Sequence, residues 1–434
     1  MNDEERWLLP TEQEAVANLR AVLELCAGGQ LKTSDRTSLP AAATVEMIAE
    51  HLVDGDFYVD NAIAAFAWPL LLQAGGLAKV ERSRLRLTPA GRDALAEPGP
   101  DTIRLLWQRW LTHAVIDEFS RVERIKGQRS ANVLTAATTR RQMVAKALAK
   151  CPVGEWLDVD ALFMKMRRGH TSPTIARSER ALWKLYLEDP EYGSFGYAGF
   201  AKWELLQGRY TLAVLFEYAG TLGLIDLDFV HPAGARDDFR DNWGGEDIEA
   251  LSCYDGLLAI RLNALGAYVL GLADTYEPPV AVEPDVRALK VLPNLDVVAT
   301  TRLSAADRLT LSAFSEQTAD HVWTVSAATL LSGVDAGRDL DEFTRFLDER
   351  TEHELPGALT TLISDVRHRI GQLTDLGHVR LIECAEPATA ALIAHDRRLR
   401  PLCRLIGDRH LAVPQDQEPK FRKALLRFGF VVGV

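Results

Sequence analysis

The sequence predicts an α+β fold, mainly helical, with two similar N-terminal units followed by a C-terminal mixed α/β domain. Two stretches repeat the same order of apolar helix, glycine turn, strand and helix start. A stretch rich in proline and acid, 275–286, separates them from a block of short β-branched runs and amphipathic segments. Because β-branched runs predict strands and amphipathic segments predict helices, both element types are expected along the chain.

The first unit, residues 1–100, is expected to hold three helices, a short β-hairpin and a further helix. The expected helices are 11–30, 40–52 and 61–74, and the expected strands are 77–81 and 84–88. Thr11 and Glu14 have the spacing of a capping box. Thr88 is expected to cap the last helix, with Pro89 in its first turn. Three helices and a hairpin in this order make a winged-helix pattern.

Residues 101–135 are expected to link the two units through a helix at 101–125. The second unit, 136–274, reads as a diverged copy of the first, in which Arg86, Leu87, Thr88 and Gly91 correspond to Arg261, Leu262, Asn263 and Gly266. A repeat of this kind indicates one fold used twice. The second unit is therefore expected to be a winged helix with a long acidic wing at 231–250.

The stretch 275–286 is the expected linker to the C-terminal domain, 287–434. The segment RALKVLPNLDVVAT, 287–300, reads as a buried strand, and 304–317 reads as the helix that follows it. Helix caps are expected at Ser304, Ser326 and Asp339. Later strands are expected at 379–384, 403–413 and 430–434.

The phrases LKVLPNLDVVA, DEFTRFLDERTEHELPGALTTLISDVRHRIGQL and RKALLRFGFVV, in this order, resemble the domain at the N-terminus of XPB-type DNA helicases. Two winged helices before such a domain are also similar to the TFIIH subunit whose clutch domain docks onto XPB. The resemblance implies that 287–434 binds a helicase, a nuclease assembly or its own copy. Strand edges at 379–384 or 430–434 would suit such docking.

The composition is ordinary for a soluble globular protein, with 47% hydrophobic and 25% charged residues. The formal net charge of -12 argues against indiscriminate coating of nucleic acid, but it allows a local basic face. The five cysteines are scattered and without a C-x-x-C pair, which is typical of reduced thiols. With no signal peptide or membrane-length apolar run, a cytoplasmic protein is expected. The Ala, Leu, Arg and Asp bias suggests a GC-rich bacterial genome.

No motif with catalytic chemistry stands out. The sequence contains no G-x-x-x-x-G-K-[ST], so neither motor domain of an XPB helicase is indicated. It also lacks H-E-x-x-H, a G-x-S-x-G elbow and a close His/Cys cluster. The acids Asp237 and Asp238 lie in a loop of mixed charge, where solvation is expected. We therefore expect no catalytic residue, cofactor or metal ion, and a protein that is not an enzyme.

The first hairpin is the leading candidate for a DNA-binding site. It carries Lys79, Arg82, Arg84 and Arg86, and the preceding loop adds Lys32 and Arg36. Alternate residues of a strand share one face, which would suit a phosphate backbone. The presumed recognition helix, 61–74, is almost entirely apolar and carries no Arg or Lys to read base edges. Duplex binding with weak sequence preference is expected, and a merely solvated hairpin is the alternative.

The second unit and the C-terminal domain supply further candidates. Lys165, Arg167 and Arg168 are expected to extend the DNA-binding surface. The acidic wing would repel phosphate and suits a basic protein partner or solvent. Trp243 is expected to anchor a partner, or else to fold back onto its domain. Arg397, Arg398 and Arg400 form a further basic group, expected either to bind a partner or to be a solvated helix face.

Together these observations predict a non-enzymatic, DNA-associated adaptor that docks onto a helicase, translocase or nuclease, with a homo-oligomer also possible. DNA repair, transcription and anti-phage defence are all open as its setting. Two alternatives are a scaffold that binds only protein and a sequence-specific winged-helix regulator. The regulator would need polar residues on its recognition helix.

Overall fold

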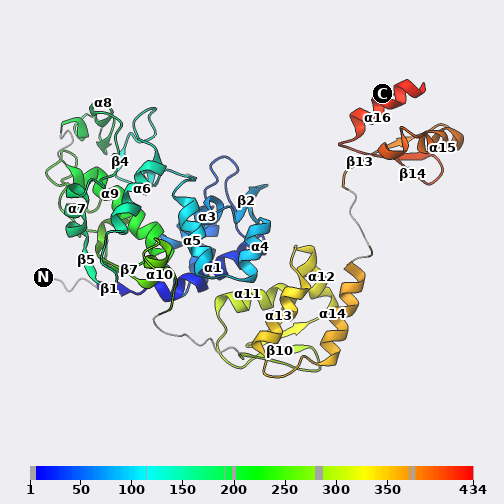
Figure 1. Ribbon diagram of the computed structural model, residues 1–434, viewed down its shortest axis with the longest axis horizontal. Coiled ribbons are helices and arrows are strands. Elements are labelled where there is room, and N and C mark those ends of the chain that lie inside the picture. Colours follow the sequence, from blue (N-terminus) through cyan, green and yellow to red (C-terminus); the bar gives the residue numbers. More distant parts are fainter. Residues whose placement is uncertain are drawn as a thin grey trace. The chain divides into compact units, whose positions relative to one another are not determined.

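The computed structural model describes residues 6–113, 115–189, 191–197, 202–278, 287–370, 372 and 377–433. The fold is mixed α/β. The chain divides into two compact units, Met1–Ile363 and Ser364–Val434 (Figure 1). This boundary falls inside the expected domain 287–434. Of the expected linker, 279–286 lie outside the described residues, and the finer domain limits stay predictions.

Residues 6–100, which we call the first region, have the element order that the sequence predicts. This region comprises α1 (Glu12–Ala27), α2 (Ala42–His51), α3 (Ala64–Ala74), the hairpin β2 (Ala78–Glu81) and β3 (Arg84–Leu87), and α4 (Pro89–Ala96). Arg82 and Ser83 form the hairpin turn with φ of 50° and 61°, as a two-residue type I′ turn requires. Thr88 Oγ1 accepts the N–H of Gly91, which confirms the expected cap.

The expected capping box at Thr11 and Glu14 is wrong. Thr11 Oγ1 instead donates to the carbonyl oxygen of Ile225 at 2.6 Å and makes no cap bond. Its partner lies 214 residues further along the chain, so the local sequence held no sign of it. This hydrogen bond ties the start of α1 to the sheet of the following region.

The expected helix 101–125 is also wrong in its extent. Helix α5 (Pro100–Trp110) ends early, and a 3-10 turn, Glu118–Arg121, follows it. The buried guanidinium of Arg141 binds the carbonyl oxygens released where α5 ends, at 2.8 Å for that of His113. Because Trp107 and Trp110 are buried and α5 packs on α3, this helix belongs to the core rather than to a linker.

The second region, which follows α5 and extends to residue 278, contains helices around a four-stranded sheet. Its helices are α6 (Ala137–Leu148), α7 (Val159–Arg168), α8 (Glu179–Leu182), α9 (Arg209–Ala213) between π-helical turns Glu204–Gly208 and Val214–Gly220, and α10 (Ala264–Val269). Short 3-10 turns lie at Phe195–Tyr197 and Cys253–Gly256. Its strands are β4 (Ile125–Lys126), β5 (Trp156–Asp158), β6 (Tyr186–Leu187), β7 (Ile225–Val230) and β8 (Leu257–Leu262).

The chain's first strand, β1 (Arg6–Leu9), completes that sheet, whose order is β1-β7-β8-β5 with all neighbours antiparallel. One hydrophobic cluster runs from Ala15 to Val269 and includes side chains from both N-terminal regions. The two expected winged-helix units therefore share a single core.

The first and second regions contain the same corner, in which a strand ends and a helix begins. In the first, the N–H of Thr88 donates to the carbonyl of Leu77 and Thr88 Oγ1 caps α4. In the second, the N–H of Asn263 donates to the carbonyl of Leu224 and Asn263 Oδ1 caps α10. A Cβ built on Gly91 would lie 2.0 Å from the carbonyl oxygen of Leu77, and one on Gly266 would lie 2.0 Å from that of Leu224. The repeated sequence positions thus have matching backbone surroundings.

The last part of the first unit is an antiparallel sheet, β11-β12-β10-β9, with helices. Its elements are β9 (Leu289–Val291), β10 (Asp296–Ala299), α11 (Ala305–Phe314), β11 (Ser315–Ala319), β12 (Val322–Val325), α12 (Ala327–Asp335), α13 (Leu340–Arg350) and α14 (Gly357–Ile370), which crosses the unit boundary. Caps at Ser304, Ser326 and Asp339 are confirmed. The expected strand 287–300 is instead two strands, because the backbone turns at Leu295 (φ 72°). The expected helix 304–317 ends at Phe314.

The compact unit Ser364–Val434 has its own small core under a three-stranded antiparallel sheet, β13-β15-β14. Its elements are β13 (Val379–Glu383), α15 (Pro387–His395), a 3-10 turn (Arg400–Leu402), β14 (Arg404–Ile406), β15 (His410–Pro414) and α16 (Glu418–Phe428). The expected strand 403–413 is a hairpin, since Gly407 turns the chain with φ of 63°. The described part of the expected strand 430–434 is not a strand, and Val434 lies outside the described residues.

Candidate nucleic-acid interface

Cations from three neighbouring chain segments lie on one face of the first hairpin. Lys79 is directly opposite Arg86, and Glu81 is directly opposite Arg84. The loop before α2 runs beside β3, where Lys32 forms a bridge with Arg84. Because residues that pair across strands share a face, these side chains form one basic surface with a single acid. We call Lys32, Lys79, Glu81, Arg84 and Arg86 the hairpin face.

Most charge on this face is available to a ligand. The side chain of Lys79 is 60% exposed, although its Nζ lies 2.7 Å from Glu81 Oε1. That hydrogen bond lowers the pKa of Glu81 and keeps it ionised. Arg84 donates to the carbonyl of Gly29 at 2.9 Å, which orients its guanidinium. Since Lys79 and Arg86 are like charges directly opposite each other, an anion placed between them would relieve their repulsion.

The other two expected residues, Arg36 and Arg82, lie next to the hairpin face in the fold. Arg82 is exposed in the turn itself, and Arg36 is exposed in the loop that contains Lys32. Asp35 fixes this loop to the turn, because its carboxylate accepts the N–H and the hydroxyl of Ser83, the first at 2.6 Å. The structure therefore brings together all six cations that the sequence assigned to the first region.

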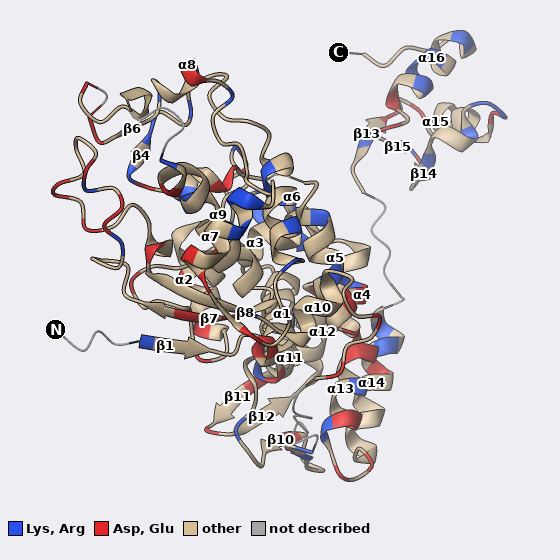
Figure 2. Ribbon diagram, turned by 60° about the vertical axis from the view of Figure 1, so that its left-hand side comes forward, with Lys and Arg blue, Asp and Glu red and all other residues tan. Residues whose placement is uncertain are grey.

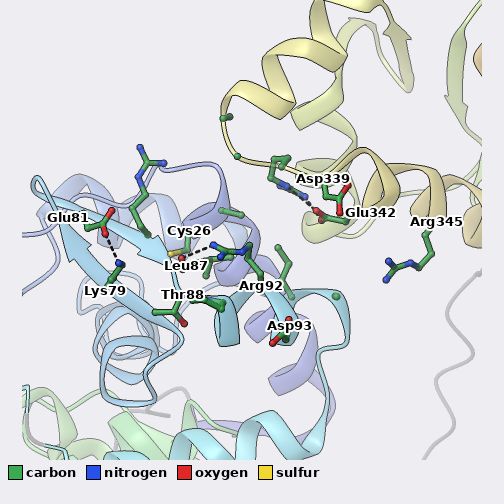
Figure 3. Close-up of a pocket in the computed structure, with 18 residues that line it drawn as sticks. Cys26, Lys79, Glu81, Leu87, Thr88, Arg92, Asp93, Asp339, Glu342 and Arg345 are labelled. Atoms are coloured by element: carbon green, nitrogen blue, oxygen red, sulfur yellow. Dashed lines mark hydrogen bonds and ion pairs between the residues drawn. The ribbon is translucent and has the colours of Figure 1, made fainter. Parts of the chain in front are cut away.

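One side of the hairpin borders a cleft of about 710 Å³. Its walls are the hairpin with α4 on one side and the α12–α13 turn on the other (Figure 3). Its lining includes five cations, Lys79, Arg86, Arg92, Arg338 and Arg345, and four acids, Glu81, Asp93, Asp339 and Glu342. Nothing in the sequence indicates that Arg338 and Arg345 are neighbours of the hairpin, because both lie in a distant segment of the chain.

The far wall of the cleft is held by a buried ion pair. Arg338 lies between Glu24 of α1, at 2.7 Å, and Glu342 of α13, at 2.6 Å. Thr310 of α11 donates to Glu24 at 2.6 Å. Burial raises the pKa of Glu24, while the nearby Arg338 acts against that shift. Arg338 is thus used in packing, whereas Arg345 is exposed at the cleft.

The expected basic residues of the second region lie on a different element. Lys165, Arg167 and Arg168 are exposed on α7, which packs mainly on β5, β8 and α6. Arg167 forms an ion pair with Glu204 at 2.6 Å. These three cations are therefore a group separate from the hairpin face.

The loop 231–250 is held on the core at Asp238, although most of its acids are exposed, namely Asp237, Asp241, Glu246, Asp247 and Glu249. Asp238 forms two hydrogen bonds of 2.7 Å with the buried guanidinium of Arg209, which also binds the buried Asp255. Phe239 is buried beside them. The expectation that Asp237 and Asp238 are both solvated is therefore wrong for Asp238. A buried arginine holds this loop on the core.

The expected partner anchors are accessible. Trp243 is 64% exposed, and its ring centroid lies 6.0 Å from that of Tyr192. In the compact unit Ser364–Val434, Arg397, Arg398 and Arg400 are exposed just after α15. The carboxylate of Asp396 accepts the N–H of Arg398 and fixes this turn.

A buried polar network that the sequence did not predict lies under α6 and α9. Arg141 pairs with Glu118 at 2.8 Å, and Glu118 accepts a hydrogen bond from Tyr210. Arg121 pairs with Glu217 at 3.0 Å beside Tyr254. In each pair the two partners come from separate elements, and in the sequence they look like ordinary solvated residues. Because each of these arginines pairs with a carboxylate inside the core, we assign the network to structure.

Residues 289–406 match the family model described as "Helicase conserved C-terminal domain". The matched segment runs from β9 to the end of β14 and includes residues of both compact units. No curated protein matches the chain. The match supports a helicase-associated protein. The resemblance to the XPB N-terminal domain stays a prediction.

Among the helices that the structure describes, none is long and apolar enough to cross a membrane. Within the described residues, no group of three or more His, Cys, Asp or Glu side chains is placed to hold a metal ion.

Proposed function

We propose that the protein is a non-enzymatic, DNA-associated adaptor that holds duplex DNA by its phosphates and docks onto a helicase, translocase or nuclease. The hairpin face is the observation that carries the proposal. Its cations come from three adjacent segments joined by backbone pairing, and two of them, Lys79 and Arg86, also line a cleft with further arginines. Lysine and arginine arrays of this kind bind the phosphate backbone independently of sequence.

We interpret residues 1–100 and 136–274 as two winged-helix units, with the β2–β3 hairpin as the first wing. In such units the helix before the hairpin usually enters the major groove. Here that helix is α3, and nearly all its residues are buried, including Trp68 and Leu72. The one polar side chain of α3, Gln73, donates to the carbonyl oxygens of Ser38 and Pro69. The proposal is therefore backbone binding rather than sequence-specific regulation.

The partner-binding role is proposed for the segment that matches the helicase family. Strand β13 is an edge of its sheet, since it pairs only with β15 in the described sheet. Its Val379 and Leu381 are 46% and 60% exposed. An exposed edge with apolar side chains on one face suits the addition of a partner strand. Arg397, Arg398 and Arg400 would add charge contacts to an acidic partner.

The test is binding to a labelled random-sequence duplex across a salt series. We expect salt-sensitive binding by the wild type. A variant with Lys79, Arg82, Arg84 and Arg86 changed to Glu should bind far more weakly, and its slope of log K against log salt should be shallower by about 3 to 4.

The matched control changes the same number of exposed cations elsewhere, namely Lys146, Lys290, Arg302 and Arg308, to Glu. It alters the net charge equally and should retain most of the binding. Equal losses in both variants would show a general charge effect instead. No binding by the wild type at low salt would overturn the DNA role and favour the protein-only scaffold, which the net charge of -12 also fits.

A further inference from the structure

Four aromatic side chains lie exposed on two neighbouring loops of the second region. They are Trp183, Tyr192, Tyr197 and Trp243, with exposed fractions of 50%, 49%, 72% and 64%. The rings of Trp183 and Tyr197 are edge-to-face with centroids 4.9 Å apart. Tyr192, Tyr197 and Trp243, with Lys202, Asp241 and Asn242, line a cleft of about 400 Å³, which we call the aromatic cleft.

Backbone contacts fix the loops that carry these rings. The N–H of Leu187 donates to the carbonyl of Gly193 at 3.0 Å, and that of Phe195 donates to Leu185 at 2.9 Å. A Cβ on Gly196 would lie 2.1 Å from the ring of Trp183, so this glycine lets the indole lie on the backbone. The rings are therefore positioned before any ligand arrives, which lowers the entropic cost of binding.

The loop that carries Trp243 is packed against the same framework. A Cβ on Gly244 would lie 3.1 Å from the carbonyl oxygen of Leu187, which places this loop beside β6. The N–H of Gly244 also donates to the carboxylate of Glu246 at 3.1 Å. Trp243 is thus held facing solvent instead of folding back into the core. Clustered exposed aromatics of this kind mark interaction sites.

The charge around the aromatic cleft is acidic. The exposed residues beside it include Glu188, Asp189, Glu191, Asp241, Glu246 and Asp247. Nearby cations are Lys202 and Arg240 in the two loops, and Arg124, whose guanidinium already pairs with Glu188. Figure 2 shows this acidic character, in red, on the loops near β6. Such a field repels phosphate and attracts cationic side chains, in contrast to the hairpin face.

We propose that the aromatic cleft binds a basic, proline-rich extended segment of a partner protein. Proline rings pack flat on aromatic faces, and their backbone lacks an N–H that would need a new partner. A polyproline II segment loses little conformational freedom on binding. Arginine or lysine beside the prolines would pair with the surrounding acids. The inference rests on the proposed role of the protein as an adaptor that docks onto a partner, and it is independent of DNA binding by the hairpin.

The test is fluorescence anisotropy of a labelled synthetic peptide that repeats Arg-Pro-Leu-Pro, titrated with the full chain. We expect saturable binding that weakens as salt rises. Trp243→Ala and Tyr197→Ala should each weaken it about tenfold or more, as loss of an aromatic anchor does. Trp156→Ala is the control, because Trp156 is also exposed but lies on β5. Asp241→Lys should weaken binding while leaving the rings in place.

Three results would overturn the proposal. They are absence of peptide binding at low salt, equal binding by Trp243→Ala in a variant that melts as the wild type does, and tight binding of oligothymidylate that depends on Trp243. Trp243→Phe keeps a ring and should retain most of the affinity, which separates an aromatic contact from a folding defect. The hairpin Glu variant should bind the peptide normally, so failure here and failure of the DNA role are distinguishable.

Discussion

The β2–β3 hairpin and the β7–β8 pair end in the same corner but face different surroundings. In each, the last strand is followed by a helix whose first turn is capped by a side chain, and a glycine of that turn packs against a backbone carbonyl oxygen. The first hairpin has a two-residue turn and an exposed basic face. The second is flanked by β1 and β5, and every residue of β7 is buried.

This contrast shows how neighbours decide what a repeated element does. The acids of β7 are neutralised inside the fold, since Asp226 binds Arg261 and Asn263, and Asp228 binds Arg6 of β1. The cations of the first hairpin have few such partners. The same corner thus supports a sealed sheet in one region and an open charged face in the other.

The largest effect is expected from the arginine that holds the β7–β8 loop on the core. Arg209→Leu leaves the buried carboxylate of Asp255 without its cation, so the free energy of unfolding should fall by about 3–5 kcal/mol. Arg240→Leu, in the exposed part of the same loop, should have little effect. Urea unfolding compares the two. Equal midpoints would mean that this loop is as free as the first hairpin turn.

A smaller effect tests whether the two corners are equivalent. Gly91→Ala and Gly266→Ala each place a Cβ against a backbone carbonyl, so each should lower the free energy of unfolding by about 1–3 kcal/mol. Gly99→Ala is the control, because a Cβ at Gly99 meets no atom within 4 Å. Thermal melts of the three variants give the comparison. A loss at only one corner would break the equivalence.

The smallest effect concerns the cleft between β1 and the loop before α3. Burial raises the pKa of Glu14 to about 7, with a further contribution from Asp54. Because the folded state holds this proton more tightly than the unfolded state does, stability is lost as pH rises from about 4.5 through about 7. Glu14→Gln should therefore raise the melting temperature at pH 8 but not at pH 4.

The control for that pH effect is Glu50→Gln, at an exposed position of α2. Its difference from the wild type should be the same at both pH values. A Glu14→Gln difference that also stays constant with pH would contradict the shifted titration.

The sequence predicted those features whose causes are local. The caps at Thr88, Ser304 and Ser326 are confirmed, because each side chain bonds a backbone N–H within three residues. Gly91 and Gly266 were aligned correctly from the repeat. The positions of Lys79, Arg84 and Arg86 on one face also follow from local sequence, since hairpin register follows from a two-residue turn.

The features that the sequence did not predict depend on distant partners. Thr11 donates a hydrogen bond to the carbonyl oxygen of Ile225, and Asp238 pairs with Arg209. Helix α5 ends where the guanidinium of Arg141 binds the carbonyl oxygen of His113. Each partner lies on another element, so no local pattern records it. The second wall of the cleft beside the hairpin was missed for the same reason.

The most direct test of the central claim is a lysine-protection experiment. The full chain is acetylated with an amine-reactive reagent, with and without saturating random-sequence duplex, and each lysine is quantified by mass spectrometry. The account predicts that duplex protects Lys32 and Lys79 while Lys146 and Lys290 react as before. Unchanged reactivity of Lys32 and Lys79 under saturating duplex would contradict DNA binding by the hairpin face.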